Sequence, residues 1–234
     1  MSIPKLAFIP ALLILSVSCV LANDSLPGKK KIFYTFTAGY TLNTVYGSMH
    51  DKDQELNYLA GLGKIKMTNK GGFSVNFRIG KRLSDFVYCK TGVSLLYRRV
   101  NPQENTIIVY RDELGTGYLS FPLIAGIKAA PGRGPVGFFL EFGPSANFSL
   151  FDNTKIGPDR SAFKTHVFSF SISPSGGLSF SFPYSTILLQ YAFVYDVTSA
   201  YTEYLYWTPA EPRKPFDYKY KTHCFSLGFQ WKPF

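Results

Sequence analysis

The segment between Phe168 and Phe182 alternates between two kinds of residue. Its even positions are mostly large and apolar, whereas its odd positions from Ser169 to Ser181 are all serine except Gly177. A period of two residues is typical of a β-strand whose two faces have different surroundings. A soluble β-protein usually covers its outer face with charged side chains, but this segment carries no charge on either face. The pattern therefore favours an apolar face that meets lipid and a small polar face that lines a tightly filled interior.

The same alternation recurs along the chain. Large apolar residues occupy every second position, and small or polar residues predominate between them. The predicted strands are Ile32–Leu42, Phe73–Gly80, Phe86–Arg99, Tyr118–Ala129, Val136–Leu150, Phe168–Phe182, Thr186–Ser199 and Lys219–Trp231. Eight is an even number, as a closed antiparallel membrane barrel requires. The sequence thus predicts an all-β fold, an eight-stranded antiparallel up-and-down transmembrane β-barrel.

Short and long connections alternate between the predicted strands. The short ones are Lys81–Asp85, Ala130–Pro135 and Pro183–Ser185, and the long ones are Thr44–Gly72, Val100–Gly117, Phe151–Thr165 and Ala200–Tyr218. Short periplasmic turns and long outer loops are typical of outer-membrane barrels. Tyrosines cluster near the predicted strand ends, where amphipathic rings suit the headgroup interface. We therefore expect the protein in the cell outer membrane, with both ends of the barrel chain on the periplasmic side.

Two of the predicted strands contain a proline. Pro122 and Pro174 lack the N–H that a β-ladder uses, so each is expected to mark a bulge, a bend or a strand end. The segment with Pro174 is also longer than the roughly 9–11 residues that a tilted strand needs to cross a bilayer. It is expected either to project beyond the membrane or to break at Pro174.

The first 22 residues have the pattern of a secretory signal peptide. Met1–Lys5 is short and basic, Leu6–Val17 is apolar, and Ala22 ends a small-residue cleavage site. Pro10 interrupts the apolar stretch, which is shorter than the roughly 20 residues of a membrane-spanning helix. We expect a signal peptide at residues 1–22 and an exported barrel domain at residues 23–234. Lipidation of Cys19 is the weaker alternative, because the bulky aliphatic residue usual three places earlier is missing.

The chain is basic, with a formal net charge of +10. Residues 1–22 contain one cation, Lys5, and no acidic residue, so residues 23–234 carry a formal net charge of +9. Excess positive charge invites a nucleic-acid hypothesis. The cations are dispersed beside predicted strands, however, where they would meet the phosphates of lipid or lipopolysaccharide. For an exported protein we expect outer-membrane lipid and lipopolysaccharide as partners, and no nucleic acid.

The residue types that bind metals are sparse and scattered. Only Cys89 and Cys224 lie within residues 23–234, on opposite faces of distant predicted strands. They are expected to be two reduced, buried thiols rather than a disulfide. His50, His166 and His223 have no metal-ligand spacing. No metal site is expected.

Two further patterns raise the question of catalysis or cofactor binding. Gly132, Gly134 and Gly137 match the spacing of a dinucleotide fingerprint, but they join two strands and open no helix, so a turn is the better interpretation. His166 lies at a strand end beside a long loop, where a barrel enzyme could place a base. No Asp or Glu accompanies it locally. We expect no catalytic residue and no cofactor.

Five charged residues have inward parity, namely Arg78, Lys90, Lys128, Glu141 and Asp196. An eight-stranded barrel has an interior just wide enough for side chains, so unpaired charges there would be costly. We expect the two carboxylates to pair with the cations in a buried ionic and hydrogen-bonded plug. The alternative is a narrow polar path or a ligand site.

Several short motifs occur in a characteristic order, namely Lys81–Phe86, Gly92–Tyr97, Tyr118–Leu123, Phe142–Ser145 and Phe225–Phe229. Through their order and spacing, the chain from Lys31 to Phe234 resembles the PorT-like outer-membrane β-barrel domain family. The resemblance implies an eight-stranded barrel in the outer membrane of a Gram-negative cell, in which Pro122 is tolerated in the fourth strand. The named member is associated with a secretion and gliding apparatus, but no motif in this chain singles out secretion.

These features lead to three hypotheses of function. The first is a non-enzymatic integral outer-membrane protein whose four long loops contact an external or envelope partner. The second is a narrow transporter or a component of a PorT-like protein-secretion machine. The third is a secreted soluble lipocalin-like barrel, whose apolar face would point inward and bind a ligand.

Overall fold

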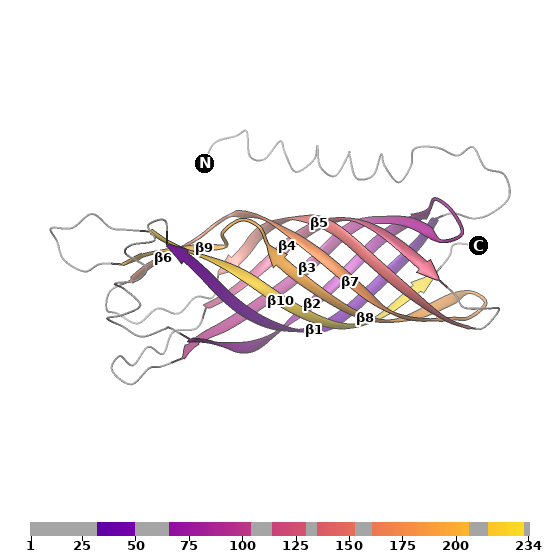
Figure 1. The fold of residues 1–234 in the computed structure, drawn as a ribbon, viewed down its shortest axis with the longest axis horizontal. Helices are drawn as coiled ribbons and strands as arrows, with labels where there is room; N and C mark the ends of the chain where they lie inside the picture. The colour runs from indigo at the N-terminus through magenta and orange to yellow at the C-terminus, as the bar shows by residue number, and fades with distance from the viewer. Residues whose placement is uncertain are drawn as a thin grey trace.

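The structure, a computed structural model, describes residues 32–49, 66–103, 114–129, 135–152, 161–205 and 215–231. It consists of β-strands joined by turns and bends (Figure 1). In chain order the strands are β1 Ile32–Met49, β2 Lys66–Arg82, β3 Val87–Gln103, β4 Leu114–Ala129, β5 Val136–Asp152, β6 Ser161–Thr165, β7 Phe168–Ser181, β8 Ser185–Asp196, β9 Tyr201–Leu205 and β10 Pro215–Trp231.

Eight long strands close into an antiparallel barrel in the order β1-β2-β3-β4-β5-β7-β8-β10, with β10 paired back to β1. The closing ladder runs without a break from Tyr34 opposite Trp231 to Met49 opposite Phe216. Neighbours in this ring are also neighbours among the long strands in the sequence, so the topology is up-and-down. The predicted eight-stranded barrel is confirmed.

The two faces of each strand have opposite characters. Outward apolar side chains such as Leu140, Leu227 and Phe142 are 62%, 60% and 56% exposed, whereas inward Thr35 and Thr37 are 1% exposed. A wall of exposed large apolar side chains around a polar interior is the arrangement of a membrane barrel. The lipocalin-like alternative requires the apolar face to point inward, and the structure has it pointing outward.

The barrel strands extend further than their apolar pattern predicts. The strand β1 continues to Met49, and β3 continues to Gln103, into segments expected to be loops. At about 3.3 Å per residue a 17-residue strand such as β3 is ~56 Å long, which, even tilted, exceeds an apolar band of about 25 Å. The alternation of lipid-facing residues stops at the membrane edge, but backbone pairing does not.

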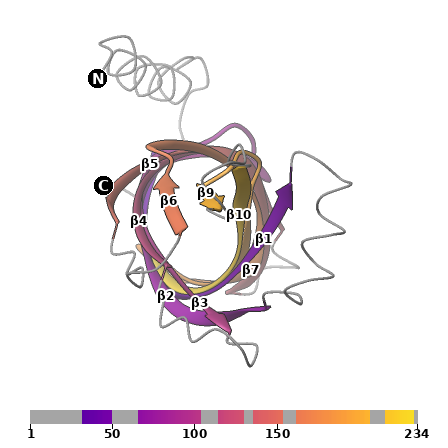
Figure 2. The same cartoon turned by 90° about the vertical axis from the view of Figure 1, so that its left-hand side faces the viewer.

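Two short strands lie in segments that were expected to be long loops. β6 and β9 pair with each other, and β9 pairs with β10 from Tyr218 opposite Tyr201 to Pro215 opposite Tyr204. Both occupy the end of the barrel away from the short turns (Figure 1), and viewed along the barrel they lie inside the ring (Figure 2). We call β6 and β9 together the mouth ribbon. The expectation of only eight strands is therefore incomplete.

Neither proline ends its strand. β7 pairs with β5 continuously through Pro174, while its ladder to β8 skips Ser173 and Pro174 and resumes in the same register. The β3–β4 ladder similarly lacks pairs at Pro122, and the hydroxyl of Thr91 donates to the Pro122 carbonyl at 2.9 Å. Of the alternatives expected at Pro174, a break or strand end is wrong, because the ladder to β5 holds the strand in place, whereas the missing pairs with β8 agree with a local disturbance.

Several large side chains point inward, beyond what the small-residue pattern predicts. Phe33 and Tyr88 are buried in the interior, each beside a glycine on an adjacent strand. A Cβ at Gly80 would collide with the ring of Phe33, and one at Gly126 with the ring of Tyr88. Glycine at these two positions makes room for rings that fill the interior.

The short turns at one end of the barrel are built locally. In the turn between β2 and β3, the Ser84 hydroxyl accepts hydrogen bonds from the backbone N–H groups of Phe86 and Val87 at 3.3 and 3.0 Å. Between β7 and β8, the N–H of Phe182 donates to the Ser185 carbonyl at 2.8 Å. Such turns use few residues and suit the predicted short links.

Some predictions fall outside the described residues. These are the signal peptide at 1–22 with Cys19, His50, the turn with Gly132 and Gly134, and much of the four long connections. The described part of the chain contains no helix that is long and apolar enough to cross a membrane.

The lipid-facing assignment predicts the effect of a charge at Leu189, which lies on the outer wall near the middle of β8 and is 45% exposed. We expect Leu189→Arg to lower the free energy of unfolding in lipid vesicles by about 2–4 kcal/mol, because the cation would lie near the bilayer midplane. Urea titration followed by tryptophan fluorescence measures this loss. Leu83→Arg in an exposed turn is the control, with about 0–1 kcal/mol expected. Equal effects at both positions would contradict the assigned face.

Candidate functional site

Glu141 on β5 is the centre of a buried ionic cluster in the interior. Its carboxylate forms an ion pair with Lys90 Nζ and accepts a hydrogen bond of 2.7 Å from the Tyr88 hydroxyl. Arg78 Nη1 lies 3.9 Å from the carboxylate, and Gln190 Nε2 donates to it at 3.1 Å. We call these five residues the Glu141 cluster. It ties together β2, β3, β5 and β8.

Burial explains why so many groups converge on this carboxylate. The side chains of Glu141 and Lys90 are 1% and 3% exposed, so neither charge is hydrated by bulk water. A buried charge is costly unless it is paired and hydrogen-bonded. Two cations and three neutral donors give Glu141 that compensation, the third donor being Ser175 Oγ at 3.4 Å.

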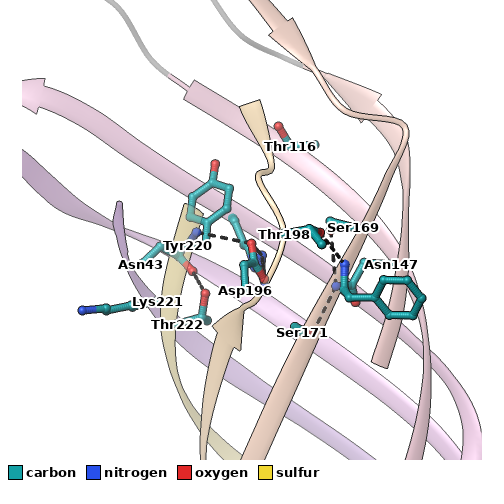
Figure 3. A network of polar contacts seen from close by, with 12 residues as sticks. Asn43, Thr116, Asn147, Ser169, Ser171, Asp196, Thr198, Tyr220, Lys221 and Thr222 are labelled. Carbon is teal, nitrogen blue, oxygen red and sulfur yellow. Dashed lines mark hydrogen bonds and ion pairs between the residues drawn. The ribbon is translucent and has the colours of Figure 1, made fainter. Parts of the chain in front are cut away.

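Asp196 lies in a separate cluster, at the end of β8 nearer the mouth ribbon. Arg98 Nη1 donates to its Oδ1 and Oδ2 at 2.9 and 2.7 Å, and both side chains are fully buried. The backbone N–H of Tyr220 adds a bond of 3.3 Å (Figure 3). β3 and β8 are four places apart in a ring of eight strands, so they form opposite walls. The Arg98–Asp196 ion pair therefore crosses the whole interior.

Aromatic rings enclose the Arg98 guanidinium. Its Cζ lies 5.2 Å from the ring centre of Tyr118 and 5.0 Å from that of Tyr220, within cation–π distance. The hydroxyl of Tyr201, on β9, is 2.5 Å from the hydroxyl of Tyr220 and also contacts that of Thr116 on β4. We call Tyr118, Tyr201 and Tyr220 the tyrosine cage. Because β4 and β10 are opposite walls, Tyr201 attaches the mouth ribbon to both sides of the barrel.

Lys128 joins neither ionic cluster. It is half-buried at the short-turn end, where its Nζ donates to Ser181 Oγ at 3.3 Å. The five residues expected to share one plug therefore lie at three levels along the barrel axis. Parity correctly placed them on the inner face, but parity carries no information on depth.

Arg98 was not among the expected interior charges. The inward parity of β3 continues from Ser94 through Leu96 to Arg98, so the signal was present in the sequence. An arginine near a strand end could also lie in water at the rim of the barrel. Arg98 lies in the interior because Asp196, its partner on the opposite wall, is at the same depth along the barrel axis.

Small polar side chains fill another part of the interior. Asn147 Nδ2 donates to Ser169 and Ser171 of β7 at 3.4 and 3.1 Å, and the Thr222 hydroxyl donates to Asn43 Oδ1 at 3.1 Å (Figure 3). Ser169 and Ser171 of β7 thus serve as hydrogen-bond partners in a narrow interior.

His166, the candidate base, lies beside a hydroxyl and a carboxylate. Its Nε2 is 2.7 Å from Thr202 Oγ1, and that hydroxyl donates to Asp217 Oδ1 at 2.6 Å. Asp217 is distant in the sequence, so a local search could not find it. Since the Thr202 proton is directed to Asp217, His166 Nε2 is the donor to Thr202 and does not activate it as a nucleophile. Thr202 is also 5% exposed, which leaves little access for a substrate.

The cysteines form no disulfide within the described chain. Cys224 is buried, with its Sγ 3.0 Å from Ser74 Oγ. Cys89 is only half-buried, so the expectation of two buried thiols is wrong for Cys89, which lies on the outer face of β3. Across the described strands and turns, no three His, Cys, Asp or Glu side chains are arranged to hold a metal ion.

A closed eight-stranded barrel with an apolar outer wall and a polar interior defines an integral outer-membrane β-barrel. The family model for the outer membrane protein beta-barrel domain matches residues 22–202, and the chain belongs to that family.

Two solved structures are similar to the chain. OprG from Pseudomonas aeruginosa is 9% identical, with a TM-score of 0.55, over 88% of this chain and 98% of OprG. Neisserial surface protein A is 14% identical, with a TM-score of 0.44, over 86% of this chain and 97% of that protein. No curated protein matches the chain. At these identities the likeness to OprG shows the shared barrel.

The Arg98–Asp196 pair predicts a large cost for removing one partner. We expect Arg98→Met to lower the free energy of unfolding in lipid vesicles by about 3–5 kcal/mol, because Asp196 would be left charged and unpaired in the interior. Urea titration measures this, and adding Asp196→Leu is expected to recover part of the loss. Lys221→Met, which removes a cation 5.9 Å from the Tyr195 ring on an outward-facing position, is the matched control with about 1 kcal/mol or less. A similar loss in both single variants would rule out a special role for the buried pair.

Proposed function

We propose that this protein is a closed, non-enzymatic outer-membrane barrel that acts through its outer loops. The observation that carries the proposal is the Arg98–Asp196 pair, which joins opposite walls of the interior. The Glu141 cluster forms a second layer of cross-links. A barrel filled in this way is a rigid support for loops rather than an open path.

The mouth ribbon supports the same function. Leu96, Val100, Ala200 and the tyrosine cage pack together as a buried apolar cluster at the outer end of the barrel. This cluster holds β9 over the mouth. An ordered mouth of this kind would support contact with a partner at this end of the barrel.

We infer that the partners are of two kinds. The outer rim carries cations such as Lys70 and Lys221, which suit the phosphates of lipopolysaccharide and outer-membrane lipid. The loops themselves would contact an envelope or external protein. The geometry of His166, whose neighbouring hydroxyl is directed to Asp217, supports a non-enzymatic role.

Two finer assignments belong to the proposal. The match to the family model begins at residue 22, which supports export by a signal peptide at 1–22. The order of the five short motifs supports a PorT-like branch of the family and a Gram-negative envelope. The secretion machine is not favoured by any contact in the described residues, so the loop-contact function is preferred.

Conductance tests whether the interior is closed. We expect the protein in planar lipid bilayers to show no steady ion conductance, because the two ionic clusters and the mouth ribbon occupy the lumen. Arg98→Ala combined with Tyr201→Ala would remove side chains from the mouth and is expected to produce brief openings. A steady conductance of the unaltered protein would overturn the closed barrel and favour transport.

Site-specific cross-linking in intact cells tests the role of the outer end. A photoreactive residue at Phe151 or Val197, both exposed near the mouth, is expected to form adducts with lipopolysaccharide or an envelope protein. The same residue at Leu83 or Tyr184, exposed in the short turns, is the matched control. Adducts from the short turns alone would place the partner in the periplasm and contradict the proposal.

A further inference from the structure

The periplasmic end of the barrel interior contains a cavity of about 320 Å³. All eight barrel strands line it, together with the turn between β2 and β3. Its inner boundary includes Lys90 and Glu141, and its rim includes Arg82, Asp85 and Lys128. We call this cavity the periplasmic vestibule. The function proposed above uses the opposite end of the molecule and leaves the vestibule without a role.

Positive charge exceeds negative charge around the vestibule. Three of the lining side chains are cationic, Arg82, Lys90 and Lys128, and two are anionic, Asp85 and Glu141. Glu141 is already paired with Lys90, and Arg78 Nη1 lies 3.9 Å from the Glu141 carboxylate. A cavity walled by the low-dielectric barrel concentrates this field, so an anion is favoured there over a cation or a neutral molecule.

A buried hydroxyl in the vestibule wall also requires a partner. Ser179 is fully buried, and its Oγ has no hydrogen-bond partner among the described residues. Buried polar groups are nearly always hydrogen-bonded, and such an exception calls for a bound molecule or water. Ser179 lines the vestibule two residues from Ser181, the hydrogen-bond partner of Lys128. An anionic oxygen placed next to Ser179 could accept a hydrogen bond from its hydroxyl and would lie near the Lys128 cation.

One part of the wall is apolar. Phe33, Phe139 and Leu188 line the vestibule and are 3%, 4% and 5% exposed. Large apolar side chains around a few polar groups are typical of small-molecule sites, and the volume lies at the lower end of their usual range of about 300–1,000 Å³. This combination distinguishes the vestibule from a purely ionic site.

We propose that the vestibule binds a small amphiphilic anion from the periplasm, a carboxylate or phosphate head with a short apolar chain. The head would lie near Arg82, Lys128 and Ser179, and the chain against Phe33, Phe139 and Leu188. A fatty acid and a phosphate ester released from lipid share this chemistry.

Binding of short-chain probes to the full-length mature protein in phosphatidylcholine nanodiscs tests the proposal. Titration calorimetry with hexanoate, hexyl phosphate and hexanol, corrected with empty nanodiscs, is expected to show binding of an anion at least tenfold tighter than hexanol. A preference for hexanoate would indicate a fatty acid, and one for hexyl phosphate a phosphate ester. Equal affinity for hexanol, or no binding beyond that of empty nanodiscs, would overturn the proposal.

Variants place the binding in the vestibule. The double variant Arg82→Gln with Lys128→Gln is expected to weaken anion binding at least tenfold, and Ser179→Val severalfold. Lys221→Gln removes one cation at the other end of the barrel and is expected to leave binding unchanged. Heat-modifiable migration on gels verifies that each variant is folded, and a folded double variant with unchanged affinity would overturn the site.

Discussion

A backbone that crosses lipid must have every N–H and C=O bonded within the protein, because the hydrocarbon region offers no water. In this chain the constraint is met by the ladder between β1 and β10, which joins the first strand to the last and leaves the membrane region without an edge. The character of the two faces follows from the closure of the barrel. Alternate side chains must point either to lipid or into a narrow interior, so one face becomes apolar and the other is limited to groups that fit and pair.

The narrow interior limits how charged side chains can be buried in it. Carboxylates and cations removed from water are stable only in pairs with satisfied hydrogen bonds, and opposite walls are close enough for side chains to meet. Arg98 and Asp196 meet across the barrel near the mouth, and Glu141 contacts its partners nearer the short turns. The side chains that pair with one another also occupy part of the lumen. Charge pairing and filling of the interior are therefore two consequences of one arrangement.

Period-two alternation allowed most of the fold to be predicted from the sequence. A segment such as β7, with phenylalanine and serine on opposite faces, specifies a strand and, after comparison with its neighbours, the direction of each face. Alternation did not predict the elements whose position is set by side-chain packing rather than by contact with lipid. β9 lies over the mouth because Tyr201 finds partners on β4 and β10, which no local pattern encodes. Pro174 interrupts the ladder to β8, as its missing N–H suggests, but it does not end β7, because pairing with β5 holds the strand through it.

The same distinction between local pattern and tertiary packing applies to the residues of the candidate sites. By itself the sequence determined which residues face inward, including Glu141, Lys90, Arg78, Lys128 and Asp196, because side chains alternate along any strand. Only the tertiary structure decided which of them meet, since the stagger between strands sets the depth of each residue. That stagger brings Arg98 to Asp196, separates both from Glu141, and leaves Lys128 at the rim of the periplasmic vestibule. Depth is a property of the whole closed ladder, so no single segment contains it.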